Sequence, residues 1–114
     1  MLSSHLRVFV AAKPVDLRTS FDRLAGIVRD QFGEDPRSGA LFFFTNKAAD
    51  RCKILFADRT GYCLLYKRLD AGTFHLPVAK DAAEARVAID ADAFARLLEG
   101  VAREVGERPR RRLH

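Results

Sequence analysis

Three strand-like runs with short connections fill the middle of the chain, and this pattern restricts the fold more than any other feature. The runs cover residues 40–45, 51–57 and 61–69 and are rich in aromatic and β-branched or alternating apolar residues. The segments between them, NKAAD and DRTG, are short enough for antiparallel hairpins. A further short strand is expected in TFHLP, which Pro77 stops. The sequence therefore predicts an antiparallel β-meander.

A helix is expected before this meander. From residue 15 to residue 33, apolar side chains recur three and four positions apart, as on one face of a helix. Asp16 is placed to cap its N-terminus, and Gly33 to end it. Arg18 and Asp22 have the spacing of a helical ion pair.

A second helix is expected near the end of the chain, with Asp90 as its cap and Gly100 past its last turn. Short strands are expected at residues 6–11 and 85–90. The predicted fold class is α+β: an antiparallel β-meander of about four to six strands flanked by an N-terminal and a C-terminal helix. A length of 114 residues suits a single domain. We assign residues 1–105 to it and residues 106–114 to a basic flexible tail.

The two cysteines and the apolar segments indicate where the chain resides. Cys52 and Cys63 lie inside strand-like runs without Cys or His partners at metal-ligand spacing, so we expect a reduced pair. The opening residues contain neither a signal peptide nor the ~20 apolar residues of a membrane span. A cytoplasmic protein without membrane contact is expected.

Positive charge is concentrated in two segments. The chain has a net charge of +5; residues 40–75 carry six basic and three acidic side chains, and residues 101–114 carry five and two. Such clustering is compatible with a surface that faces phosphates. Many soluble domains are mildly basic, so the charge alone does not decide.

The candidate DNA-binding side chains lie in the meander and the tail. In the meander, Tyr62 and Tyr66 accompany the cluster Lys47, Arg51, Lys53, Lys67 and Arg68. Alternation puts Arg51 and Lys53 on the face opposite Ile54, and hence toward solvent if Ile54 is in the core. The alternative is the ordinary polar face of a half-exposed sheet. In the tail, four guanidinium groups could bind phosphates or only aid solubility; they belong to Arg108, Arg110, Arg111 and Arg112.

Catalysis, cofactors and resident metals are not expected. Asp50, Asp58 and Asp70 would suit a metal-dependent nuclease, but they lie near turns, which aspartate favours through bonds to the backbone. The three histidines are isolated, and no phosphate-binding glycine motif is present.

Three runs also carry a family resemblance: VDLRTSFDRLAGIV from residue 15, the long run from Asp35 to Pro77, and LLEG from residue 97. In order and spacing they resemble the small accessory protein, called TnpB or the second open reading frame, of the IS-sixty-six type of bacterial insertion sequences. The matching motif positions include Asp16, Arg18, Phe21, Asp22, Asp35, Pro36, Gly39, Asp58, Gly61, Tyr66, Gly72 and Pro77. One departure is the turn TNKAAD, which keeps only Lys47 where the family often has two or three basic residues.

This resemblance implies a bacterial accessory role in DNA transposition and recombination, alongside a separate large transposase that cuts and joins the strands. The expected partners are the DNA ends of the insertion sequence, the transposase, or both. A protein–protein adaptor without DNA binding of its own is the alternative, and a metal-dependent nuclease is a more remote one.

Overall fold

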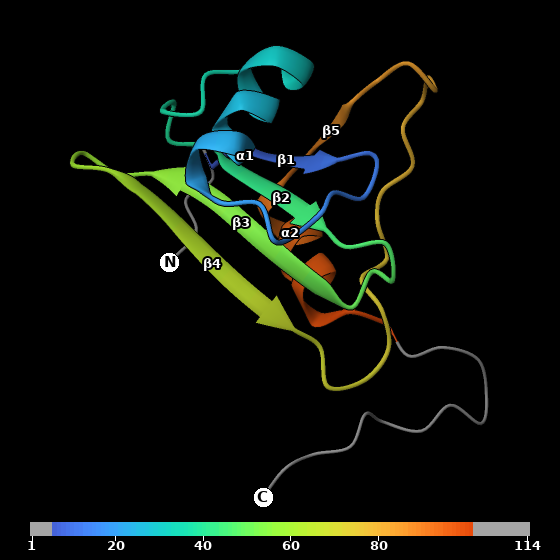
Figure 1. Ribbon diagram of the computed structural model, residues 1–114. Coiled ribbons are helices and arrows are strands. Elements are labelled where there is room, and N and C mark those ends of the chain that lie inside the picture. The colour runs from blue at the N-terminus through green and yellow to red at the C-terminus, as the bar shows by residue number, and fades with distance from the viewer. Residues whose placement is uncertain (1–5, 102–114) are drawn as a thin grey trace, which may run out of the picture.

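A computed structural model describes residues 6–101, which form one sheet with helices on its two faces (Figure 1). In chain order the elements are β1 (Val8–Ala11), α1 (Phe21–Ile27), the π-helical turn η1 (Val28–Phe32), β2 (Leu41–Thr45), β3 (Arg51–Ala57), β4 (Tyr62–Arg68), β5 (Arg86–Ile89) and α2 (Ala91–Glu99). The order of strands across the sheet is β4-β3-β2-β1-β5. None of the described helices is long and apolar enough to cross a membrane.

The predicted meander is present as β2, β3 and β4, which pair antiparallel. The sheet as a whole is mixed, however, so the expectation of a purely antiparallel sheet was wrong. β1 lies parallel to β2 and antiparallel to β5. The reason is the connection between β1 and β2: the chain crosses over through α1 and returns in its original direction, as parallel neighbours require.

The helices also depart from the predicted arrangement. They do not flank the strands along the chain, because β1 precedes α1. The first helix begins at Phe21 with Ser20 as its N-cap, and not at Asp16. The predicted strand in TFHLP is absent, since Thr73 forms only an isolated bridge with Val101.

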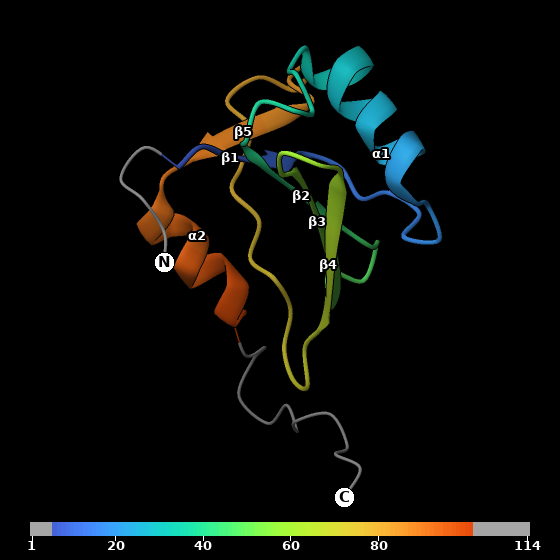
Figure 2. The ribbon, with the colours of Figure 1, turned by 90° about the vertical axis from the view of Figure 1, so that its left-hand side faces the viewer.

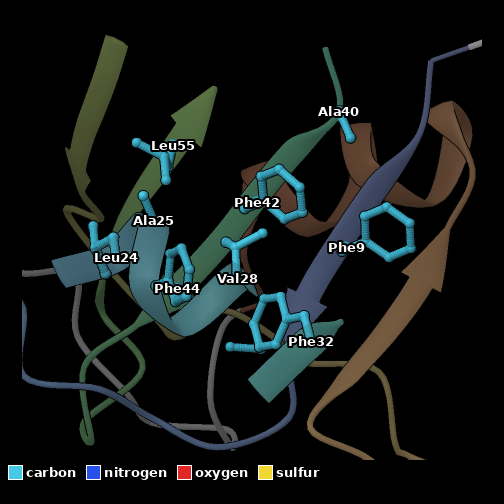
Figure 3. Packing of buried hydrophobic residues seen from close by; sticks show 10 residues of the cluster. Phe9, Leu24, Ala25, Val28, Phe32, Ala40, Phe42, Phe44 and Leu55 are labelled. Atoms are coloured by element: carbon cyan, nitrogen blue, oxygen red, sulfur yellow. The ribbon is translucent and has the colours of Figure 1, made fainter. Parts of the chain in front are cut away.

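Aromatic side chains of the central strand are buried on both faces of the sheet. Successive side chains of a strand point to opposite faces, and Phe42, Phe43 and Phe44 all have no exposed surface. Phe42 and Phe44 pack in one cluster with Leu24 of α1 and Val28 of η1 (Figure 3). The opposite face packs against α2, so the sheet is the middle of three layers (Figure 2).

The expected ends of α2 are confirmed. The Oδ1 atom of Asp90 accepts a hydrogen bond from the backbone N–H of Ala93 at 2.8 Å. Gly100 follows the last turn with φ of 74°, and a Cβ there would lie 2.7 Å from Cδ1 of Leu69. A glycine is therefore needed both for the backbone and for the packing.

Replacing Phe42 by Ala should lower the free energy of unfolding by about 3–5 kcal/mol, because it removes a ring that stacks on Phe9 and leaves a cavity. Urea unfolding monitored by circular dichroism would measure this. Val78→Ala is the control, since Val78 is 89% exposed, and should change the free energy by less than about 0.5 kcal/mol. Similar small losses for both variants would contradict this description of the core.

Candidate nucleic-acid interface

The basic side chains of β3 and β4 are divided between the two faces of the sheet. In the β3–β4 register, Arg51 lies opposite Arg68 and Lys53 opposite Tyr66, while Lys67 lies opposite Cys52. Residues directly opposite each other share a face. The first four side chains therefore lie on the α1 face and Lys67 lies on the α2 face, so the predicted cluster is not one surface.

Lys53 is half-buried and bound to the protein itself. Its ammonium donates to the carbonyl oxygen of Thr19 at 2.8 Å and lies 5.4 Å from the centre of the Tyr66 ring. The expectation of a solvent-facing pair thus holds for Arg51, which is exposed, but not for Lys53. The physical reason is that the segment before α1 covers part of this face.

Lys67 is also half-buried and binds the end of α2. Its ammonium donates to the carbonyl oxygen of Leu98 at 2.7 Å. The last carbonyls of a helix lack partners within the helix, and a cation there is favoured by the helix dipole. Lys67 therefore connects the sheet to the last turn of α2.

The exposed remainder is a small patch formed by Arg51, Tyr66 and Arg68, which we call the Arg51–Arg68 patch. These three residues and Asp70 line a depression of about 370 Å³. Tyr66 is 56% exposed, and its hydroxyl accepts a long hydrogen bond of 3.5 Å from Nη1 of Arg51. Lys47 is exposed in the turn before Arg51.

The two arginines of this patch lie side by side on neighbouring strands. Like charges directly opposite each other in a sheet repel. Within residues 6–101, neither guanidinium forms an ion pair. A phosphate oxygen between them would remove the repulsion and accept their hydrogen bonds.

Asp16 and Arg18 form a local pair in the turn before α1. Nε and Nη2 of Arg18 donate to both carboxylate oxygens of Asp16, the shortest contact being 2.7 Å. Hydrogen bonds from Arg18 lower the pKa of Asp16 to about 2. The expected role of Asp16 as a helix cap was wrong, because α1 begins only after Ser20. The expected pairing of Arg18 with Asp22 was also wrong, because Nε and Nη2 of Arg18 bind the nearer carboxylate of Asp16.

Asp58 closes the β3–β4 turn. Its Oδ1 atom accepts from the backbone N–H groups of Thr60 and Gly61, both at 2.9 Å. These bonds lower the pKa of Asp58, with the one from Thr60 contributing most. Asp50 accepts from the side-chain amide of Asn46 at 2.7 Å. In the part of the chain that the structure describes, no three His, Cys, Asp or Glu side chains are close enough to hold a metal ion.

Several of the other motif positions have structural roles. Asp35 accepts from the backbone N–H of Arg37 at 2.9 Å, and Pro36 is buried. Gly39 and Gly72 have positive φ angles of 92° and 73°, which glycine adopts without strain. The motif positions just named therefore serve mainly to shape turns.

One contact was not foreseen. The guanidinium of Arg37 lies 4.4 Å from the centre of the Tyr62 ring. Nothing along the chain links this turn to β4, so no sequence pattern could have indicated the contact. The tail arginines, Arg108, Arg110, Arg111 and Arg112, lie outside the described residues.

Lys67→Met should lower the free energy of unfolding by about 1–2 kcal/mol, because it keeps an apolar stem but removes the bond to α2. Arg68→Met is the matched control on the same strand and should cost less than about 0.5 kcal/mol, since Arg68 is exposed. Urea unfolding measures both. Equal losses would show that the Lys67 bond contributes nothing particular.

Asp58→Ala should lower the midpoint of thermal unfolding at pH 7 and make it less sensitive to acid. The pKa of Asp58 is depressed in the folded state. Its contribution is therefore complete above the unfolded value of about 3.9 and disappears as the pH falls through the folded value. Thermal melts at pH 7 and below about pH 4 measure the effect. Asp30→Ala removes an exposed carboxyl and should leave the acid sensitivity nearly unchanged; a similar change in both variants would contradict the role given to Asp58.

Comparison with known proteins places the chain in a family. Residues 6–108 match the family described as IS66 Orf2 like protein. The uncharacterized protein y4jC of Sinorhizobium fredii is 37% identical over 81 residues, which cover 71% of this chain and 69% of the relative. The uncharacterized protein y4hO of the same organism is 34% identical over 97 residues, covering 85% and 82%. No solved structure matches significantly. The chain therefore belongs to the IS66 Orf2-like family of insertion-sequence proteins.

Proposed function

We propose that this protein is a non-catalytic accessory protein of DNA transposition and that it binds DNA through the Arg51–Arg68 patch. The observation that carries the proposal is the pair of exposed guanidinium groups held opposite each other beside an exposed tyrosine ring. Membership of the IS66 Orf2-like family supports the transposition context.

The chemistry of the patch suits the sugar–phosphate backbone. Guanidinium groups bind phosphate oxygens through paired hydrogen bonds, and a tyrosine can donate to a phosphate or stack on an unpaired base. Lys47 in the neighbouring turn would extend the basic surface. Contacts of this kind position a protein on DNA without reading its sequence. Any preference for the ends of the element would have to come from other contacts, such as those of the transposase.

The tail is a second source of phosphate contacts under this proposal. Arg108, Arg110, Arg111 and Arg112 place four cations within five residues, and arginine side chains bind phosphates whatever the base sequence. Lys53 and Lys67 are assigned no DNA contact, because each ammonium is bound to a backbone carbonyl of the protein.

An adaptor that binds another protein and no DNA is the alternative. It is favoured by two exposed apolar side chains: Phe21 of α1 is 40% exposed, and Leu65 of β4 is 48% exposed. Under this alternative the arginines would meet acidic side chains of the partner, and the transposase of the same element is the natural candidate.

Fluorescence anisotropy distinguishes the two proposals. A labelled terminal-repeat duplex and a scrambled duplex would be titrated with the protein at about 50 and 200 mM salt. We expect binding that weakens steeply with salt, because each neutralised phosphate releases counterions. No binding to either duplex at low salt would refute the DNA proposal. Retention of the transposase in a pull-down would then support the adaptor.

The double variant Arg51→Gln/Arg68→Gln tests the patch itself. It should reduce the slope of log affinity against log salt by about two units, roughly one per lost phosphate contact. The control Arg29→Gln/Arg96→Gln removes the same charge from exposed helical positions and should change the slope far less. Equal effects would show that only net charge matters. Removal of residues 106–114 measures the contribution of the tail in the same assay.

A further inference from the structure

The outer edge of β4 is uncovered in the described structure. β4 pairs only with β3 and forms one border of the sheet (Figure 1). It is seven residues long and contains no proline, whereas the opposite border, β5, has four residues. A long edge strand presents a row of unpaired backbone groups, and proteins usually shorten, bend or cover such an edge.

The residues whose backbone groups point outward can be identified from the hydrogen bonds at the two ends of the hairpin. The N–H of Leu69 donates to the carbonyl oxygen of Asp50, and that of Asp58 to Gly61, both at 2.9 Å. Bonded pairs recur at every second position of an antiparallel ladder. The odd-numbered residues of β4 therefore bond to β3. The N–H and C=O groups of Tyr62, Leu64, Tyr66 and Arg68 point away from the sheet.

The side chains in the middle of this edge are apolar and exposed. Leu65 is 48% exposed on the α2 face, and Tyr66 is 56% exposed on the α1 face. Lysine commonly protects an edge strand from pairing. The ammonium of Lys67 is held by the carbonyl oxygen of Leu98, so it does not protect this edge.

We propose that β4 pairs antiparallel with β4 of a second copy of this chain, with the two-fold axis at Leu65. In this register Tyr62 lies opposite Arg68 of the second copy, and Leu64 opposite Tyr66. Every outward-facing residue thus meets an outward-facing residue, as hydrogen-bonded pairs require. A register shifted by two residues would also pair outward-facing residues with each other, but it would leave one end of β4 unpaired. The dimer does not depend on DNA binding.

The side chains agree with this register. The two copies of Leu65 would meet on the axis as a non-hydrogen-bonded pair, with Cα atoms about 4.5 Å apart. Arg68 would lie beside the aromatic ring of Tyr62, an arrangement that favours cation–π contact. Antiparallel pairing also keeps the two Arg51–Arg68 patches near opposite ends of the paired strands, about 20 Å apart for seven residues. An acidic strand from another protein would complement the arginines but not the apolar centre.

Cysteine cross-linking tests the register. Both variants carry Cys63→Ser, which removes the other accessible thiol of β4. In the proposed dimer, Leu65→Cys places the thiols of the two copies opposite each other. In Tyr66→Cys, the Cα atoms of residue 66 in the two copies lie farther apart than the roughly 7 Å that a disulfide allows. Cys52 is buried, which raises its pKa to about 11 and keeps it unreactive. We expect Leu65→Cys to form a disulfide-linked dimer at least about tenfold faster under mild oxidation. Tyr66 is more exposed than Leu65, so random collision would cross-link Tyr66→Cys faster than Leu65→Cys. Faster cross-linking of Tyr66→Cys, or no cross-link in either variant, would overturn the proposal.

Light scattering tests the dimer without a covalent bond. We expect the mass of the wild-type protein to rise toward that of a dimer between about 5 and 200 µM. Leu65→Lys should weaken the dimer at least about tenfold by placing like charges on the axis, with an unchanged circular dichroism spectrum because Leu65 is at the surface. Val78→Lys is the control, being 89% exposed and away from the edge. A wild-type protein that remains monomeric at every concentration would overturn the proposal, even if its β4 edge paired with another protein. An equal effect of the two lysine variants on the mass would also overturn it.

Discussion

Phe42, Phe43 and Phe44 stand on alternate sides of β2, and their complete burial requires apolar cover on both faces of the sheet. This requirement accounts for the three layers. The α1 face is closed by α1 and η1, and the ring of Phe44 stacks on Phe32 of η1 at 5.7 Å. The other face is closed by α2, and there the ring of Phe43 meets Phe74 edge-on at 5.4 Å. The cover on both faces decides which polar side chains of the outer strands remain in water.

Two lysines of the hairpin bind these covering segments. Lys53 reaches the carbonyl of Thr19 just before α1, and Lys67 reaches the carbonyl of Leu98 near the end of α2. Each bond joins residues more than thirty positions apart along the chain, and a half-buried ammonium is stabilised by such a carbonyl. In the sequence these lysines look like members of a DNA-binding cluster. In the structure they stabilise the fold, and of the four basic side chains on β3 and β4 only Arg51 and Arg68 are exposed.

The proposed DNA surface and the proposed dimer edge share β4. The patch uses side chains on the α1 face, whereas the dimer uses mainly the outward backbone groups and Leu65. Arg68 takes part in both, because it belongs to the patch and would lie beside Tyr62 of the second copy. In the dimer, two patches related by a two-fold axis would lie on a continuous sheet. Two basic patches related by a two-fold axis would allow one dimer to contact two DNA segments in the same way.

The sequence by itself determined the local elements. The run 51–57 forms β3 with the predicted bounds, and Asp90 and Gly100 begin and end α2 as expected, because strand alternation and helix caps depend on near neighbours. Only the tertiary structure decided the pairing of β1 with β2 and β5 and the roles of the two lysines. Those features depend on contacts between distant segments, which neither the periodicity nor the spacing of residues records. The Arg51–Arg68 patch is intermediate: alternation placed Arg51 in solvent, but only the β3–β4 register put Arg68 opposite it.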